Sequence, residues 1–226
     1  KNDYPTIAIF NSMLLKEYFE NNHYHFAHSF AFDPVLNDGL RNALEKIPEQ
    51  VRKKKQILVY GRPGTERNAF NLVVAALKKW VFMQPDIEAW EILSAGEMHR
   101  TVALGNGKEL TSVGKLSIEE YANMLEESYA GISLMCSPHP SYPPLEMSVF
   151  DVKTITNTYA NKDLKDFNEN IISLDNISPM NIAKHLVEIC KSYQTEVRHI
   201  AANPLYVKND HVFDFVEDIK KILDEE

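Results

Sequence analysis

The chain has 226 residues, 44% of them hydrophobic and 25% charged, so it can bury a core without disulfides or a structural metal. Its formal net charge of −8 gives it no field that would gather nucleic acid, which argues against a nonspecific nucleic-acid binder. No apolar run approaches the ~18 residues of a membrane-spanning helix, and we expect no signal peptide.

The N-terminal part predicts one strand–helix unit, an aromatic extended stretch and a second helix. The expected elements are a strand over 6–10, a helix over 13–21, an extended stretch over 24–32 and a helix over 35–47. Asp33-Pro34 breaks the aromatic stretch, and Pro48 closes the second helix. We therefore expect residues 1–48 to be the tail of one domain and the segment that leads into the next.

From Gln56 onward, short apolar runs alternate with amphipathic helical patterns. The expected strands cover 57–60, 90–93, 101–104, 110–113, 131–136, 154–157 and 171–174. The expected helices cover 67–82, a segment opened by the capping box of Ser117 and Glu120, 144–150, 178–197 and 211–223. This alternation predicts an α/β fold, a Rossmann-like domain with a mainly parallel sheet flanked by helices. We expect that domain over 49–200 and a C-terminal helix within 201–226.

Three smaller features carry expectations of their own. Cys136 and Cys190 lie in apolar surroundings without metal spacing, and two free thiols fit a reducing cytoplasm. The basic run 52–55 is expected to be a solvated flank, with contact to anionic lipid as the alternative. The histidines of 23–28 match no familiar zinc spacing, so we expect them to be half-buried or on the surface.

Ligands of doubly wound sheets bind at the carboxyl ends of the strands, here after Tyr60, Val113, Cys136 and Asn157. Arg62 and Arg67 follow the first of these at the mouth of a helix, where both side chains and the helix N-terminus can meet a diphosphate. The alternative is a polar loop whose arginines face solvent. No Gly-Lys-Ser/Thr follows, so the segment is not a P-loop.

Two further loops contain unusual residues. Lys115 precedes the N-cap Ser117, where it can bind phosphate or be an ordinary flanking charge. The loop 137–146 is rich in proline and aromatic residues and ends at Glu146, which can accept both hydroxyls of a ribose or can simply favour the helix dipole. Gly105 and Gly107 are not followed by a third glycine, so a dinucleotide fingerprint is missing.

Taken together, these loops carry a resemblance to a known family. Its motifs are similar to "YGRP…RN", "GKLS.EEYA", "SPHPSYPPLEM" and "TN.Y..KDL", which stand here at 60–68, 114–122, 137–147 and 156–164. The chain thus resembles glycosyltransferases of family 4 with the two-domain GT-B fold, and especially bacterial rhamnosyltransferases of surface-glycan and rhamnan synthesis. The resemblance covers roughly residues 5–195 and implies the C-terminal, nucleotide-sugar-binding half of such an enzyme.

The resemblance also implies roles for the site. Arg62, Arg67 and Lys115 would neutralise the donor diphosphate as it leaves, which makes Arg62 and Lys115 the expected catalytic residues. The remaining expected nucleotide-sugar contacts are Gly61, Asn68, Leu116, Ser117, His139, Pro140, Ser141, Tyr142 and Glu146. Among them, Leu116 and Ser117 would meet the base, Glu146 would hold the ribose, and His139 to Ser141 would lie near the phosphates and sugar.

This chain departs from the family pattern at two positions. Pro138 stands where the family often has a second glutamate near the donor sugar, which puts the sugar contact in question rather than nucleotide binding. Asp151 stands where a glycine is usual, and aspartate tolerates a left-handed backbone better than most residues.

The resemblance and the residue pattern together define a hypothesis and its competitors. The chain contains no Asp-x-Asp pair, so we expect no metal and no cofactor beside the dTDP- or UDP-sugar donor. We expect transfer of a sugar to a growing cell-surface polysaccharide, with dTDP-rhamnose as the most specific expectation for the donor. The alternatives are a noncatalytic nucleotide-sugar-binding module, a nucleotide-sugar epimerase and, last, a dinucleotide-dependent oxidoreductase.

The expected context follows from the same hypothesis. The glycan acceptor would bind mainly to a preceding domain, so this chain alone is expected to show little or no transfer activity. We expect a cytoplasmic location, with association at the inner membrane face left open. The sequence leaves the sugar, acceptor, linkage, anomeric outcome and oligomeric state open.

Overall fold

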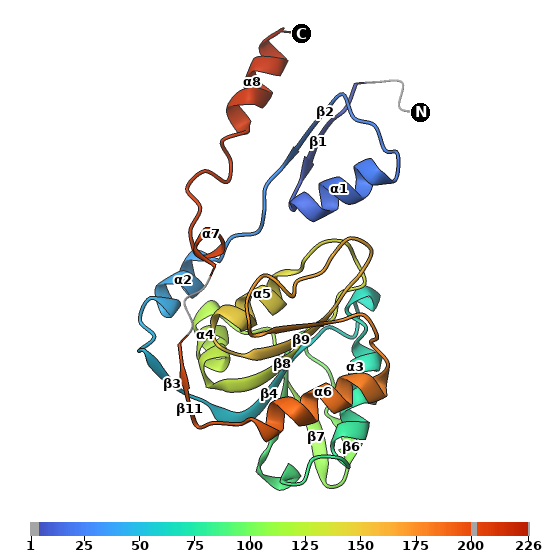
Figure 1. Cartoon of the computed structure of the whole chain (residues 1–226), viewed down its shortest axis with the longest axis vertical. Helices are drawn as coiled ribbons and strands as arrows, with labels where there is room; N and C mark the ends of the chain where they lie inside the picture. The colour runs from blue at the N-terminus through green and yellow to red at the C-terminus, as the bar shows by residue number, and fades with distance from the viewer. Residues whose placement is uncertain (1–4, 200–202, 226) are drawn as a thin grey trace.

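A computed structural model describes residues 5–199 and 203–225. Its elements are β1 (Ile7–Phe10), α1 (Met13–Asn21), β2 (His28–Ala31), α2 (Asp38–Leu44), β3 (Gln50–Arg52), β4 (Lys54–Gly61), α3 (Phe70–Trp80), β5 (Glu91–Gly96), β6 (Val102–Gly105), β7 (Lys108–Gly114), α4 (Ile118–Glu127), β8 (Ser128–Ile132), α5 (Tyr142–Val149), β9 (Lys153–Asn157), β10 (Ile171–Leu174), α6 (Pro179–Lys191), β11 (Glu196–Arg198), α7 (Pro204–Val207) and α8 (Val216–Glu225). Figure 1 shows their arrangement.

The centre of the molecule is a seven-stranded sheet with the strand order β10-β9-β8-β4-β5-β7-β6. All neighbours pair in parallel except β6 and β7, which form an antiparallel hairpin. The α/β fold with a mainly parallel sheet is therefore confirmed. The strand order reverses at β4, because the chain first adds strands on the β5 side and then returns to place β8 on the other side.

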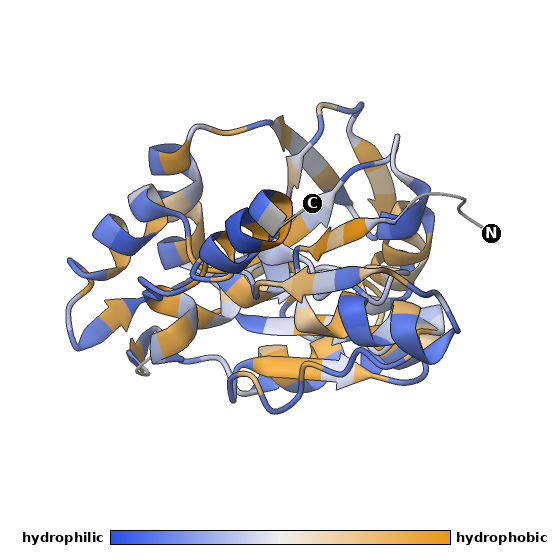
Figure 2. Ribbon diagram, turned by 90° about the horizontal axis from the view of Figure 1, so that it is seen from above, coloured by the Kyte–Doolittle hydropathy of each residue, from blue (hydrophilic) through white to orange (hydrophobic). Residues whose placement is uncertain are grey.

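Hydrophobic cores cover both faces of this sheet. Ile57 and Val59 of β4 are fully buried in the core that contains α3 and α6, whereas Leu58 is fully buried in the core that contains α2, α4 and α5. This alternation follows from the two-residue period of a strand. Figure 2 shows the hydrophobic strands between helices whose outward sides are hydrophilic.

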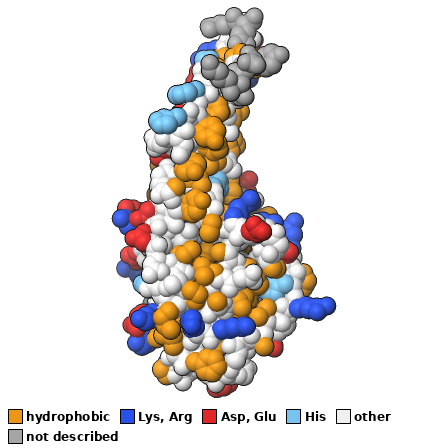
Figure 3. Space-filling model, turned by 90° about the vertical axis from the view of Figure 1, so that its right-hand side faces the viewer, with side chains coloured by type: hydrophobic (Ala, Val, Ile, Leu, Met, Phe, Trp, Pro, Cys, Tyr) orange, Lys and Arg blue, Asp and Glu red, His pale blue; other side chains and the backbone are white. Residues whose placement is uncertain are grey.

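The N-terminal segment forms a small unit of its own above this sheet. Strands β1 and β2 pair in parallel and do not join the seven-stranded sheet. The amide of Asn161, in the loop after β9, donates to the Leu14 carbonyl of α1 at 2.9 Å and so links this unit to the domain below. The two parts give the molecule a narrow upper end and a broad lower body (Figures 1 and 3).

The C-terminal segment returns from the domain to the N-terminal unit. Helix α7 lies beside α2, where Leu36 N donates to Tyr206 O at 2.7 Å. Beyond it, the ring of Phe215 stacks on Phe30 of β2 with centroids 5.6 Å apart. The chain therefore crosses between the two parts twice, once before α2 and once after α7.

Several helix and strand limits differ from those predicted. The helix expected over 67–82 is interrupted at Ala69, whose left-handed φ of 49° separates a short 3-10 turn from α3. The strand expected over 131–136 is β8, which begins and ends earlier. The helix expected over 178–197 ends at Lys191, and the following β11 pairs with β3. The helix expected over 211–223 begins only at Val216.

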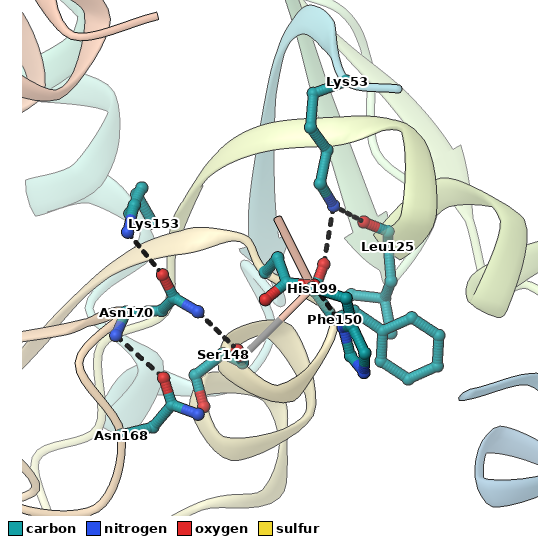
Figure 4. A network of polar contacts seen from close by, with 9 residues as sticks. Lys53, Leu125, Ser148, Phe150, Lys153, Asn168, Asn170 and His199 are labelled. Carbon is teal, nitrogen blue, oxygen red and sulfur yellow. Dashed lines mark hydrogen bonds and ion pairs between the residues drawn. The ribbon is translucent and has the colours of Figure 1, made fainter. Parts of the chain in front are cut away.

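The basic run 52–55 is not uniformly solvated, so that expectation is wrong for Lys53. The side chain of Lys53 is 2% exposed, and its ammonium donates to the carbonyls of Phe150 and Leu125 at 2.6 and 3.1 Å (Figure 4). Nearby, Asp151 adopts a φ of 58°, the left-handed conformation expected at that position, and accepts a hydrogen bond from His199. Neither contact has a signal in the local sequence.

Close packing at the end of β4 leads to the first prediction. A Cβ on Gly61 would collide with Ser94 Oγ and approach Phe70 Cε2 to 3.0 Å. Since Ser94 Oγ also bonds His99 Nε2, the site has little freedom to adjust. We expect Gly61→Ala to lower the free energy of unfolding by about 1–3 kcal/mol, measured by urea denaturation.

The matched control is Gly107→Asn in the β6–β7 turn. Its Cβ would meet nothing within 4 Å, and asparagine tolerates the positive φ of 72°. An unchanged unfolding free energy in Gly61→Ala would show that β4 and β5 are packed less tightly than described.

Candidate functional site

A cavity of about 810 Å³ opens at the carboxyl ends of the central strands. This volume lies in the range of sites that enclose small ligands. The wall consists of residues that follow β4, β5, β7 and β8, with one contribution from the end of β1: Asn11, Tyr60, Arg62, Arg67, Ala95, Gly96, Lys115, Leu116, Ser117, Ile118, Tyr121, Met135, Ser137, His139, Ser141, Tyr142, Pro143 and Glu146. The cavity therefore occupies the crevice where the strand order reverses.

Most of the site residues expected from the sequence lie together in this wall. They are Arg62, Arg67, Lys115, Leu116, Ser117, His139, Ser141, Tyr142 and Glu146. Three others do not line the cavity. Asn68 is buried and donates to the Leu134 carbonyl at 3.3 Å, Gly61 lies against Ser94, and Pro140 is buried beneath the loop. These three residues are buried next to lining residues and so contribute to the packing of the wall rather than to its surface.

Sequence reasoning missed the part of the wall contributed by distant segments. Asn11 comes from the N-terminal unit, and Ala95 and Gly96 from the end of β5, a strand whose following loop was not inspected. The rule that ligands meet the carboxyl ends of parallel strands would have found β5. Tyr121 had a weaker signal, since it lies one turn beyond the capping-box serine and so faces the same way.

The loop after β4 and the start of α4 bring three cations into one cavity. Arg62, Arg67 and Lys115 all line it. No ion pair within residues 5–199 and 203–225 involves any of them. The carboxylate of Glu120 is used by the capping box, because it accepts hydrogen bonds from the Ser117 backbone and hydroxyl at 2.8 Å. The cavity is thus suited to a multiply charged anion.

His139 presents a fixed donor to the same cavity. Its Nδ1 accepts the backbone N–H of Ser141 at 2.9 Å, so the ring proton is assigned to Nε2. That Nε2 is buried. Burial lowers the pKa of His139, and the charges of Lys162 and Arg67 lower it further. A hydrogen bond to the Asn11 backbone opposes this shift. The ring is therefore favoured in its neutral form at the cavity wall.

The turn that carries His139 is strained where it enters α5. Ser141 has φ 69° and ψ 145°, close to a region that glycine alone normally occupies. Pro143 and Pro144 follow in the first turn of α5 and have no N–H to donate. The proline-rich sequence therefore holds the loop rigidly and leaves few backbone donors at this helix end.

Among residues 5–199 and 203–225, Glu146 is the single carboxylate that lines the cavity. The hydroxyl of Tyr121 donates to its Oε2 at 3.2 Å. Burial raises the pKa of Glu146 to about 7, and this hydrogen bond opposes the shift. The carboxylate can accept hydroxyl groups of a ligand when it is ionised, and it carries a proton part of the time near neutral pH.

Other candidate groups do not form a site. His23, His25 and His28 are exposed, as the surface alternative predicted. Among residues 5–199 and 203–225, no three His, Cys, Asp or Glu side chains gather closely enough to hold a metal ion. In the same ranges, no helix combines the length and the apolar character that crossing a bilayer requires.

Sequence comparison adds a family match. Residues 55–187 match the family described as WsaF, C-terminal domain. The O-antigen biosynthesis protein RfbC of Myxococcus xanthus is 35% identical over 127 residues, which are 56% of this chain and 10% of that protein. The chain thus spans about a tenth of the length of this curated relative.

Structural comparison shows the fold. Anabaena HepE, in complex with UDP and glucose, aligns with a TM-score of 0.66 and 10% identity over 100% of this chain and 64% of that one. A variant of S. aureus TarM, in complex with UDP among other ligands, aligns with a TM-score of 0.62 and 12% identity over 81% of this chain and 36% of that one. These neighbours are GT-B glycosyltransferases, so the fold is that of a GT-B domain.

The environment of Glu146 leads to the second prediction. Because the native state holds its proton more tightly than the unfolded chain, the free energy of unfolding falls as the pH rises from 4.5 towards about 7. Glu146→Gln removes this penalty. We expect the variant to be more stable by about 1–3 kcal/mol at about pH 8.5, and the difference to vanish near pH 4.5.

Urea denaturation at the two pH values measures this difference. Glu119→Gln, an exposed glutamate at the start of α4, is the control and should show no such pH dependence. If Glu146→Gln were the less stable protein at the higher pH, the carboxylate would be better solvated than the burial of Glu146 indicates.

Proposed function

We propose that this chain, which belongs to the WsaF C-terminal domain family, binds the nucleotide-diphosphate sugar donor of a GT-B glycosyltransferase. The donor would be a dTDP- or UDP-sugar, and the transfer would extend a cell-surface polysaccharide. The observation that carries the proposal is the cavity in which Arg62, Arg67 and Lys115 stand without acidic partners in the described residues, beside one carboxylate. Cations suit a diphosphate, and a carboxylate suits sugar hydroxyls.

The nucleoside fits the wall on the α4 and α5 side. Leu116, Ser117 and Ile118 offer backbone groups and an apolar surface for the base, and Tyr142 can lie against it. Glu146 would accept hydroxyl groups of the ribose, with Tyr121 keeping one carboxylate oxygen occupied. These roles match those that the family resemblance implies for the same residues.

Catalysis in this scheme is electrostatic. Breaking the bond between sugar and diphosphate leaves negative charge on the diphosphate, which Arg62 and Lys115 would stabilise and Arg67 would help to neutralise. His139 would donate its Nε2–H to a diphosphate or sugar oxygen. This takes over the sugar contact that the family assigns to a glutamate at the position of Pro138. The scheme uses no metal ion.

The finer assignment rests on the relatives. RfbC is an O-antigen biosynthesis protein, and the four motifs resemble those of family 4 rhamnosyltransferases. We therefore propose dTDP-rhamnose as the specific donor and a surface glycan as the acceptor. The acceptor would bind to a further domain, and the donor would be used on the cytoplasmic side of the membrane.

Nucleotide binding gives the third prediction. A nucleoside diphosphate at about 100 times its dissociation constant should stabilise the chain by ~2.7 kcal/mol. The melting temperature should then rise by roughly 5–10 °C with dTDP or UDP, less with GDP, ADP or NAD, and should be insensitive to EDTA. Arg62→Ala and Lys115→Ala should lose most of this shift.

Lys78→Ala is the matched control, because Lys78 is an exposed cation on α3 outside the cavity. It should shift like the unsubstituted chain. A requirement for Mg²⁺ or Mn²⁺ would contradict the roles assigned to Arg62, Arg67 and Lys115. The absence of a shift with every nucleoside diphosphate would favour a noncatalytic module.

Transfer activity gives the fourth prediction. This chain alone should transfer little or no rhamnose from dTDP-rhamnose to a rhamnose-containing acceptor, whereas a fusion to the acceptor domain of a relative should transfer it. Product formation is followed by mass spectrometry. Turnover by the chain alone would overturn the expectation, and isomerisation of free dTDP-rhamnose without acceptor would indicate an epimerase.

A further inference from the structure

Lys162 is a buried lysine in the segment 156–164, the one family-like motif to which no role has been given. It closes a tight turn after β9, in which Tyr159 and Lys162 exchange backbone hydrogen bonds of 3.0 and 2.8 Å. Its side chain is 0% exposed. The ammonium donates to the carbonyl of Met135 at 2.6 Å. This interaction joins the turn to the loop that follows β8.

The charge of Lys162 has no acidic partner in the part of the chain that the structure describes. No ion pair there involves it, and the adjacent Asp163 pairs with Lys165 at 3.3 Å. Burial lowers the pKa of Lys162 to about 8, and the nearby Cys136 thiol acts in the opposite direction. An ammonium has three donors, and the hydrogen bond to Met135 uses one. An unpaired buried charge is costly, so it calls for a compensating anion.

The ammonium lies directly behind the cavity wall. Met135, whose carbonyl it binds, lines the cavity together with Ser137 and His139. The charges of Lys162 and Arg67 both lower the pKa of His139, so both reach the imidazole that faces the cavity. Asn157 holds Met135 from the same side, accepting its N–H at 2.7 Å and donating to its carbonyl at 3.2 Å.

We propose that Lys162 is a further determinant of diphosphate binding, a buried cation that fixes the Met135–His139 wall and is compensated when the anionic donor enters the cavity. The inference rests on the proposed function, because it assigns a fourth cation to the same diphosphate. It explains why a lysine is buried here where an apolar side chain would be cheaper to bury.

The test replaces Lys162 by methionine, which has a similar length and no charge. Calorimetry measures the affinity for dTDP and, separately, for thymidine, which lacks the diphosphate. Lys162→Met should bind dTDP on the order of tenfold more weakly and thymidine as before. Lys53→Met is the matched control, because Lys53 is equally buried and bonded to carbonyls but lies at the opposite end of β4. It should bind dTDP with unchanged affinity.

Unaltered dTDP affinity in Lys162→Met, with Arg62→Ala impaired, would overturn this inference and leave the proposed function standing. Failure of the unsubstituted chain to bind any nucleoside diphosphate would overturn both. An equal loss in Lys53→Met and Lys162→Met would mean that burial of either lysine matters only for folding, and would also overturn the inference.

A second measurement needs no variant, in case Lys162→Met does not fold. The titratable groups that interact with the ammonium are Cys136 and His139. Binding of dTDP to the unsubstituted chain at about pH 8.5 should be accompanied by proton uptake, seen as a dependence of the binding enthalpy on the ionisation enthalpy of the buffer. Binding without proton uptake would overturn the inference.

Discussion

The reversal of strand order at β4 is the constraint on which the site depends. Strands added on its two sides send their following loops in different directions, so the carboxyl end of β4 is left uncovered between them. Arg62 leaves β4 at this point, Lys115 arrives from the β7 side and the His139 loop from the β8 side. Because side chains of β4 pack into a separate core on each face of the sheet, the end of the strand that carries these loops is held in place. The strand order therefore determines where the cavity lies, and the side chains determine what it can bind.

A positive cavity in an acidic protein has a physical consequence. The net charge of −8 is carried by the outer surface, where the acidic side chains form ion pairs with lysines or stand in water. Inside the cavity, Arg62, Arg67 and Lys115 meet one carboxylate that is only partly ionised near neutral pH. An anionic ligand is therefore repelled by most of the molecule and attracted at one place, which favours selective over nonspecific binding. The strained Ser141 and the buried Glu146 belong to the same pattern, since each reduces stability at a position that faces the ligand.

The sequence predicted what local interactions determine. The capping box of Ser117 and Glu120, helix α1 and strand β10 formed as expected, because the side chains that specify them lie within a few residues of one another. The sequence did not predict the features that depend on contacts between distant segments. The apolar run that ends at Cys136 leaves the sheet after Ile132 because Asn157 holds Met135, and Lys53 is buried because the carbonyls of Leu125 and Phe150 receive its ammonium. Asn11 reached the cavity wall through the arrangement of the two parts, which no local pattern encodes.

The double crossing of the chain governs how the two parts can move. One crossing precedes α2, the other follows α7, and the hydrogen bond between Leu36 and Tyr206 links them at the lower domain. Two parts joined by one connecting segment can rotate about that segment. Two connecting segments that are hydrogen-bonded to each other oppose such rotation more than they oppose bending. Asn11 and Lys115 belong to the two bodies and face the same cavity. A bend at the two crossings would therefore change the distance between Asn11 and Lys115, and with it the width of the cavity.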